Sequence, residues 1–279
     1  MKFLAIKSLF ILFVLTQFIY AQFDPGAKQI ALSNSDVAVS DNVFALFSNP
    51  AGLAQIDNNE VGVFFSPSPF GMSELKNAFA AFKFPMNFGT MAIGGMVYGF
   101  DLYKESKISL GGSYNYQNNF YLGATLNYKN ISIKNYGSKS AIIFDLGLLA
   151  IITDKLHFGF SYKNITRSSL SSTTDELPVE ILSGLSYKII DNCTISLAVD
   201  KDIRYKASPR FGIDYKIIKY LSLRTGFSKT PNLYSFGIGI HYSIFDFNYA
   251  LFTHQELGLT HQIGVIISFN KNDADENAK

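Results

Sequence analysis

Residues 108–133, with the sequence ISLGGSYNYQNNFYLGATLNYKNISI, decide the fold of this chain. Apolar and polar side chains alternate along this stretch, first up to Tyr116 and again from Phe120. A period of two is the spacing of side chains on one face of a β-strand, and Asn118-Asn119 between the two runs is typical of a turn. The stretch is therefore a predicted β-hairpin with one apolar face and one polar face.

The same alternation recurs through most of the chain. Counting the runs between residues 60 and 269 gives fourteen predicted strands. Dividing residues 60–269 among fourteen strands leaves each strand enough residues for a membrane span of about 9–11 residues and a short turn. We therefore expect an all-β fold, an antiparallel transmembrane barrel of about fourteen strands.

The predicted connections alternate in length. The short ones lie at 85–88, 117–119, 153–155, 190–192, 218–220 and 243–244, and the longer ones at 67–75, 99–105, 134–139, 165–177, 201–207 and 229–233. Short turns on one rim and long loops on the other are typical of bacterial outer-membrane barrels, in which both termini are periplasmic. The predicted location is accordingly the outer membrane, with both termini on the periplasmic side.

The composition favours lipid over a soluble core. Hydrophobic residues make up 48% and aromatic residues 15% of the chain, yet no segment after the leader has the roughly 18 apolar residues of a membrane helix. A soluble sandwich or barrel is the alternative, but it would have to pack bulky residues from every strand at crystal-like density, whereas lipid accepts them freely. Outer-membrane lipid is therefore an expected partner.

The two ends of the chain carry their own signals. Residues 1–21 have two lysines, an apolar core and a terminal Ala21, as in a secretory signal peptide. Without them the 24 basic residues fall to 22, equal to the 22 acidic residues, and this balance argues against a nucleic-acid partner. Residues 270–279 are polar and are predicted to be a disordered tail.

Residues 22–59 precede the strands and are a predicted plug, because a barrel of fourteen strands is too wide for side chains alone to fill. Within this segment, Ser40 or Asp41 could cap a short helix over Val43–Phe47, which we expect to be the only helical part after the signal peptide. The predicted helix ends at Asn49-Pro50. The plug motif is Asn49, Pro50, Ala51, Gly52 and Leu53, in which Gly52 permits a tight turn.

Charged residues occur on the predicted inward faces of several strands. They include Asp145, Lys163, Arg210, Asp214, Arg224 and Asp246. Such residues can form a selectivity path, but on a wetted wall they more often form a structural network. The four histidines lack metal-type spacing, and the sequence contains no nucleophile elbow and no phosphate loop before a helix. We therefore expect no cofactor, no metal and no enzymatic activity.

The N-terminal segment resembles a known family. Gly26-Ala27, Val37 to Asn42, Ala45-Leu46 and Ser48 to Ala54 are similar to the N-terminal signature of the PorV/PorQ family, grouped with the fatty-acid transporter FadL among fourteen-stranded barrels. Asn34-Ser35-Asp36 departs from the glycine pair and alanine usual in that family.

The resemblance implies two functions and leaves a third open. PorV-like proteins serve type IX secretion, which implies secretion-system components or secreted cargo as partners. FadL-like proteins take up long-chain fatty acids or other hydrophobic small molecules, although this chain is short for FadL's large extracellular groove. A structural barrel or general porin is the third possibility.

Overall fold

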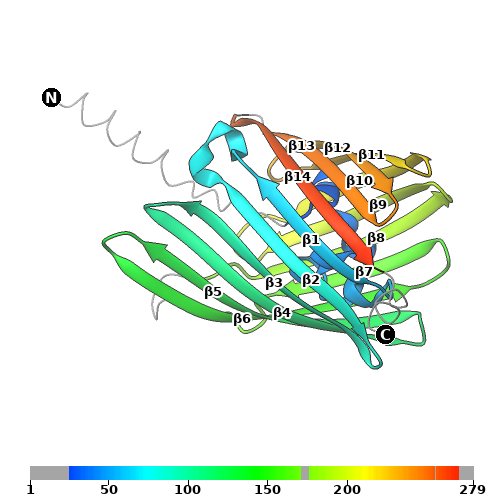
Figure 1. Ribbon diagram of the computed structural model, residues 1–279, viewed down its shortest axis with the longest axis horizontal. Coiled ribbons are helices and arrows are strands. Elements are labelled where there is room, and N and C mark those ends of the chain that lie inside the picture. The colour runs from blue at the N-terminus through cyan, green and yellow to red at the C-terminus, as the bar shows by residue number, and fades with distance from the viewer. Residues whose placement is uncertain (1–24, 171–175, 255, 270–279) are drawn as a thin grey trace, which may run out of the picture.

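The computed structural model describes residues 25–170, 176–254 and 256–269, so the predicted signal peptide and the predicted tail lie outside the described residues. Fourteen strands form one closed barrel in which each strand pairs with its sequence neighbours and β1 pairs with β14 (Figure 1). The predicted fourteen-stranded antiparallel barrel is confirmed. The strands are β1 Asn59–Ser66, β2 Asn77–Met86, β3 Gly89–Phe100, β4 Tyr103–Tyr116, β5 Phe120–Ile133, β6 Gly137–Ile151, β7 Leu156–Lys163, β8 Glu180–Ile190, β9 Cys193–Asp202, β10 Ser208–Ile218, β11 Leu221–Ser228, β12 Leu233–Tyr242, β13 Phe245–His254 and β14 Gly258–Phe269.

Alternation places the bulky apolar side chains outside the barrel and the small polar ones inside. In the β4–β5 hairpin, Leu110 is 49% exposed and Leu122 53% exposed, while the inward Ser109 and Thr125 are 0% and 1% exposed. This arrangement is the reverse of a soluble core and matches the outward apolar band of a membrane barrel. None of the described helices is long and apolar enough to cross a bilayer.

The predicted loops at 99–105 and 134–139 are wrong. Strands β3 to β6 continue beyond the residues in which apolar and polar side chains alternate. Only residues 101–102 and 134–136 lie between these strands. The outward side chains change from apolar to polar partway along, although the backbone pairing continues. Loss of apolar alternation therefore marks the end of the lipid-facing surface and not the end of the strands.

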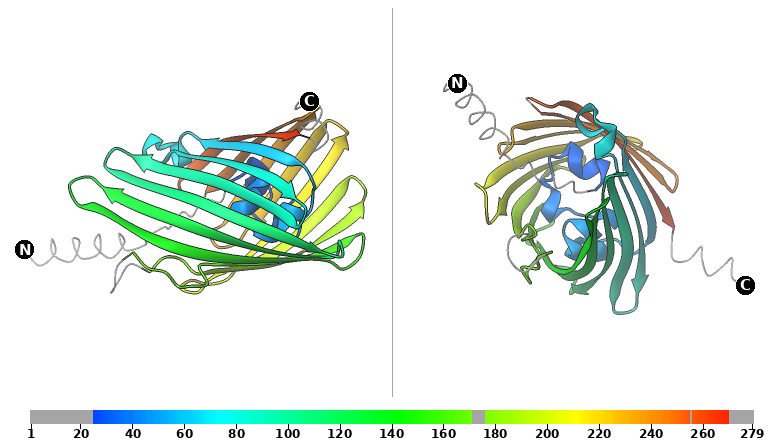
Figure 2. Two further views of the ribbon diagram at one scale, coloured as in Figure 1. Left: turned by 60° about the horizontal axis from the view of Figure 1, so that its bottom comes forward. Right: turned by 90° about the vertical axis from the view of Figure 1, so that its left-hand side faces the viewer.

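Register places this change at one level on three strands. Ile108, Tyr128 and Ile142 lie opposite one another in one outward row, and Ser106, Asn130 and Ser140 form the next row. The Asn130 side chain donates a hydrogen bond to Ser140 Oγ at 2.9 Å within the polar row. Beyond this row the hairpins β3–β4 and β5–β6 project from the barrel as an extended lobe (Figures 1 and 2).

The segment before β1 is more helical than predicted. It contains α2 Ala27–Ala31 and the short 3₁₀ helices η1 Asp36–Ala38, η2 Val43–Phe47 and η3 Pro50–Ala54, and η4 Pro69–Gly71 and η5 Ser73–Leu75 lie between β1 and β2. The expectation of one helical segment, capped by Ser40 or Asp41, is wrong. Asn42 caps η2 by accepting a hydrogen bond from the Phe44 amide. Helix α2 has only five residues and is flanked by glycine and polar residues, so its apolar face produces no clear helical period in the sequence.

Candidate functional site

Residues 27–54 occupy the lumen of the barrel and make a circuit of its inner wall. Helix α2 contacts β11 to β14, η1 contacts β7 to β9, η2 contacts β1 to β4, and η3 contacts β3 to β6. In the view along the barrel, these blue helical turns lie inside the ring of strands (Figure 2). We call residues 25–58 the plug.

Inward-facing glycines let the plug backbone approach the wall. A Cβ at Gly123 would lie 2.3 Å from Ala51 N, and one at Gly159 would lie 2.2 Å from Val37 O. A Cβ at Gly147 would lie 2.2 Å from Asn49 Oδ1. Real Cβ atoms do not approach other heavy atoms so closely, so these positions accept only glycine while the plug is in place. The glycines on the polar face of the sequence therefore indicate contact with the plug, which periodicity alone does not reveal.

Asn49 joins two parts of the plug to the wall. Its Oδ1 accepts a hydrogen bond from Ala51 N at 3.3 Å, and its Nδ2 donates to Val37 O at 2.7 Å and to Leu148 O in β6 at 3.2 Å. The residue is fully buried. Asn49 thus caps η3 and fixes η1 and β6 to the same side chain.

The other residues of the plug motif have distinct contacts. Pro50 is the first residue of η3, where a missing N–H costs nothing. Ala51 O accepts a hydrogen bond from Ser113 Oγ in β4 at 2.8 Å. Gly52 is required by close approach and not by a turn, since a Cβ there would lie 1.7 Å from Ser40 O. Leu53 is fully buried in the apolar cluster between plug and wall.

Wall hydroxyl groups, which the sequence did not single out, satisfy buried carbonyl groups of the plug. Ser161 Oγ donates to Ser48 O at 2.7 Å, and Thr125 Oγ1 donates to Leu46 O at 3.3 Å. A buried carbonyl group without a partner costs free energy, so these hydroxyls stabilise the seated plug. In the sequence, these hydroxyl residues are marked only by their inward positions on the strands.

The apolar side of the plug packs against the first strands of the barrel. Phe44 contacts Phe64 edge-on with ring centroids 6.4 Å apart, and Phe47 contacts Phe79 in the same way at 5.3 Å. Phe64 and Phe79 are almost completely buried although they point into the lumen. At β1 and β2 the lumen is therefore an apolar core and not a water-filled wall.

Two ion pairs hold the plug region together. Lys28 Nζ lies 2.7 Å from Asp41 Oδ1, joining α2 to the segment before η2. Burial opposes both charges, but the attraction of Asp41 raises the pKa of Lys28, and the attraction of Lys28 lowers the pKa of Asp41.

The second pair, which sequence reasoning missed, lies between β1 and β2. Lys83 Nζ is 3.4 Å from Glu60 Oε2, and both side chains are nearly inaccessible to solvent. Lys83 also donates to Ile56 O at 3.1 Å, which ties the end of the plug to the wall. Two opposite charges on inward positions of adjacent strands, at Glu60 and Lys83, are the signal that could have found them.

The charges that the sequence predicted to be luminal form separate local groups. Arg224 donates to Asp214 at 3.1 Å and to Asn248 at 2.6 Å, and both charged groups act on Lys28 of the plug. Asp145 accepts from Asn127 at 2.7 Å and from the Asn164 amide at 2.8 Å. The remaining pairs join adjacent strands, namely Lys163 with Glu180 at 3.5 Å, Arg210 with Asp200, and Asp246 with His241.

These groups do not converge on one point. Each of these six charged residues has a partner on a neighbouring strand, which is the arrangement of a structural network. Within the described ranges no group of three or more His, Cys, Asp or Glu side chains could hold a metal ion.

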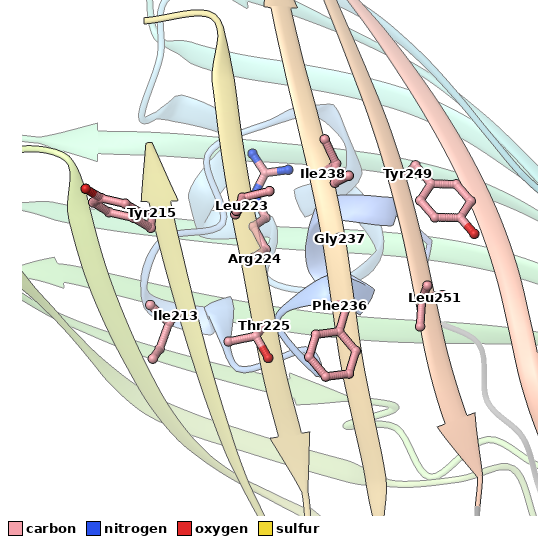
Figure 3. A pocket seen from close by; sticks show the side chains of 10 residues that line it. All are labelled: Ile213, Tyr215, Leu223, Arg224, Thr225, Phe236, Gly237, Ile238, Tyr249 and Leu251. Carbon is pink, nitrogen blue, oxygen red and sulfur yellow. The ribbon is translucent and has the colours of Figure 1, made fainter. Parts of the chain in front are cut away.

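The outer wall carries an apolar hollow over β10 to β13, with a volume of about 380 Å³. Leu223, Phe236 and Tyr249 line it, and Figure 3 shows Gly237 in the strand between them with the plug running behind. A Cβ at Gly237 would lie 2.4 Å from Ala31 Cβ, so only the strand backbone separates this hollow from α2.

Several solved structures share this fold. The Pseudomonas putida toluene transporter TodX has a TM-score of 0.67 at 15% identity, covering 88% of this chain and 98% of that chain. The CymD monoaromatic hydrocarbon channel has a TM-score of 0.67 at 13% identity with the same coverage, and a Pseudomonas aeruginosa FadL homologue has 0.57 at 13% identity, covering 88% and 97%. At these identities the similarity shows the fold alone, a FadL-like outer-membrane barrel.

No curated protein matches the sequence. A family model described as type IX secretion system membrane protein PorP/SprF matches residues 77–267, from the start of β2 into β14. This match agrees with the predicted relation to type IX secretion. The family that it identifies is PorP/SprF and not PorV/PorQ. The chain belongs to the PorP/SprF family of type IX secretion system membrane proteins.

Proposed function

We propose that this chain serves type IX secretion as a sealed outer-membrane barrel that binds other secretion components or secreted cargo, and that it neither conducts solutes nor catalyses a reaction. The observation that carries the proposal is the circuit of the plug around the inner wall, with buried hydrogen bonds such as Asn49 to Leu148 O. A plug held at so many points is suited to a docking scaffold. We further propose that both chain termini are periplasmic and that the described plug follows a cleaved signal peptide.

A PorV-like role, in which the barrel receives cargo after it crosses the outer membrane, is the finer form of this proposal. The family match supports secretion-system partners in general.

Hydrophobic uptake is the second candidate, favoured by the fold shared with TodX and CymD. Against it, every strand is hydrogen-bonded to both of its neighbours over at least part of its length, and serine, asparagine and paired charges line much of the lumen. Outside the apolar core at β1 and β2, the lumen has few apolar side chains along which an apolar substrate could move.

Gene deletion with complementation separates the candidates. We expect deletion to abolish surface delivery of secreted proteins, measured by proteomics of the medium and of the cell surface, and to leave growth on oleate or toluene unchanged. Normal secretion with impaired growth on either compound would support uptake instead. Normal secretion and normal growth would contradict both and favour a structural role.

A further inference from the structure

The wall of the barrel has an open strand edge on the projecting lobe. Strands β6 and β7 pair only from Leu146↔Tyr162 to Ile151↔His157, whereas β6 begins at Gly137. Among the described residues, no strand pairs with positions 137–145 on the side away from β5. Half of β6 therefore has a strand neighbour on one side only.

The backbone polar groups on this edge can be assigned from two contacts. Phe144 O accepts a hydrogen bond from Ile165 N at 2.9 Å, and Ile142 O accepts one from Ser168 Oγ. Even-numbered residues of β6 therefore direct their backbone groups away from β5, since N–H and C=O of one residue project to the same side of an antiparallel strand. The segment 164–168 covers the edge at 142–144. Ser138 and Ser140 lie beyond it, and both are exposed.

This part of the edge is suited to water and not to lipid. Unpaired N–H and C=O groups are too costly in the hydrocarbon of a bilayer. Ser140 belongs to the first polar outward row, beside Asn130, and Ser138 lies opposite Ser132 in the next row. The open edge therefore lies where a soluble partner can reach it.

The surroundings of the edge are basic. The lobe segments 98–107 and 127–141 contain five lysines and two acidic residues. Glu105 is paired with Lys129 at 2.7 Å, and Lys104 and Lys134 are exposed. The loop between β7 and β8 contains Arg167, Asp175 and Glu176, a net charge of −1, so the lobe and this loop together carry a net charge of +2. Excess positive charge beside an open edge complements an acidic strand.

We propose that the β6 edge at Gly137–Ala141 is a strand-addition site for an extended acidic peptide. In this mode the added backbone pairs with Ser138 and Ser140, while acidic side chains meet the lobe lysines. Strand addition uses backbone hydrogen bonds for affinity, and alternate side chains of the peptide face the lysines. The proposal deepens the proposed function by naming its partner's chemistry, and rests on it only for the claim that the partner belongs to the secretion system.

The test uses the full-length barrel in nanodiscs and a fluorescein-labelled peptide in which threonine and valine alternate with glutamate. Fluorescence anisotropy measures its binding, and the same peptide with lysine in place of glutamate is the charge control. Ser140→Pro removes the N–H on the open side and leaves the hydrogen bonds between β5 and β6 in place. Edge strands tolerate proline at such positions. Ser140→Ala is the matched control, because it keeps that N–H and loses only the hydroxyl.

We expect the glutamate peptide to bind wild type and Ser140→Ala equally, and Ser140→Pro at least about tenfold more weakly, as for the loss of roughly 1.4 kcal/mol. Heat-dependent gel mobility checks that Ser140→Pro is folded, and Ser138→Pro replaces it if it is not. Equal binding to the proline and alanine variants would overturn strand addition. Equal binding of the lysine peptide would overturn acidic recognition, and no binding to wild type would overturn the site. Each readout is independent of the secretion phenotype, so the proposed function can fail or stand separately.

Discussion

Asn49 in the plug donates its side-chain amide to the carbonyl oxygen of Leu148 in β6 at 3.2 Å, and the same nitrogen donates to Val37 O at 2.7 Å. One buried side chain thus links two helical turns of the plug and one strand of the wall. Asn49 therefore contributes both to the fold of the plug and to its attachment to the barrel wall.

Replacing Asn49 and Pro50 together with alanine is expected to loosen the plug. The change removes an N-cap and two donated hydrogen bonds, each contributing about 1 kcal/mol. We expect higher single-channel conductance in planar bilayers than for wild type. Asn119→Ala, in an exposed turn, is the control. Conductance equal to wild type in the double variant would show that this motif is not what closes the lumen.

Gly123→Ala is expected to displace η3 from the wall. Its Cβ would meet the backbone of Pro50 and Ala51, which cannot rotate away, and such overpacking costs about 1–3 kcal/mol. Gly95→Ala is the matched control, because a Cβ there meets only Lys107 O at 3.5 Å. We expect the temperature of the gel-mobility shift to fall for Gly123→Ala and to hold for Gly95→Ala. An equal fall in both would mean that glycine matters here for the strands and not for the plug.

Acidification is expected to weaken the plug through Asp41. Its pKa is lowered in the folded protein by Lys28, although burial opposes the shift. The stabilisation is therefore present above the ordinary aspartate pKa, about 3.9, and is lost as pH falls through the lower folded value. The raised pKa of Lys28 affects only the alkaline limit, where stabilisation is lost as pH rises above the ordinary lysine pKa.

Bilayer recordings check this dependence. Wild type is expected to leak more as pH falls below about 4, whereas Asp41→Asn leaks at neutral pH and changes less on acidification. Asp101→Asn, in an exposed turn, should behave as wild type. An identical acid response in wild type and Asp41→Asn would show that the Lys28–Asp41 ion pair does not cause the leak at low pH.

The lipid boundary on the lobe can be mapped by cysteine labelling in a Cys193→Ser background. Ser106→Cys and Asn130→Cys are expected to react with a membrane-impermeant maleimide on intact vesicles, because they lie in the polar row. Ile108→Cys and Tyr128→Cys, in the adjacent apolar row, should remain unlabelled until detergent is added. Labelling of both rows would place the boundary deeper in the barrel and reduce the lipid-facing height of β4 and β5.

Alternation determined the number of strands and the face that each side chain occupies, and together with the loop lengths and the composition it indicated the membrane location. Leu110 and Leu122 face lipid because a strand exposes every second residue to the same side, and this property is local in sequence. The end of η2 before Asn49-Pro50 is equally local, because proline disfavours helical geometry in the residue before it. Such features are legible in a single sequence.

Only the tertiary structure decided where the plug lies and why particular residues are needed. Gly123 touches Ala51, and Lys83 pairs with Glu60, through contacts between segments whose mutual placement depends on closure of the whole barrel. The extension of β4 to β6 past the apolar pattern was also hidden, because backbone hydrogen bonds continue the strands after the side chains have changed to suit water. Periodicity reports the solvent that each side chain meets, whereas these features depend on which backbone lies beside it.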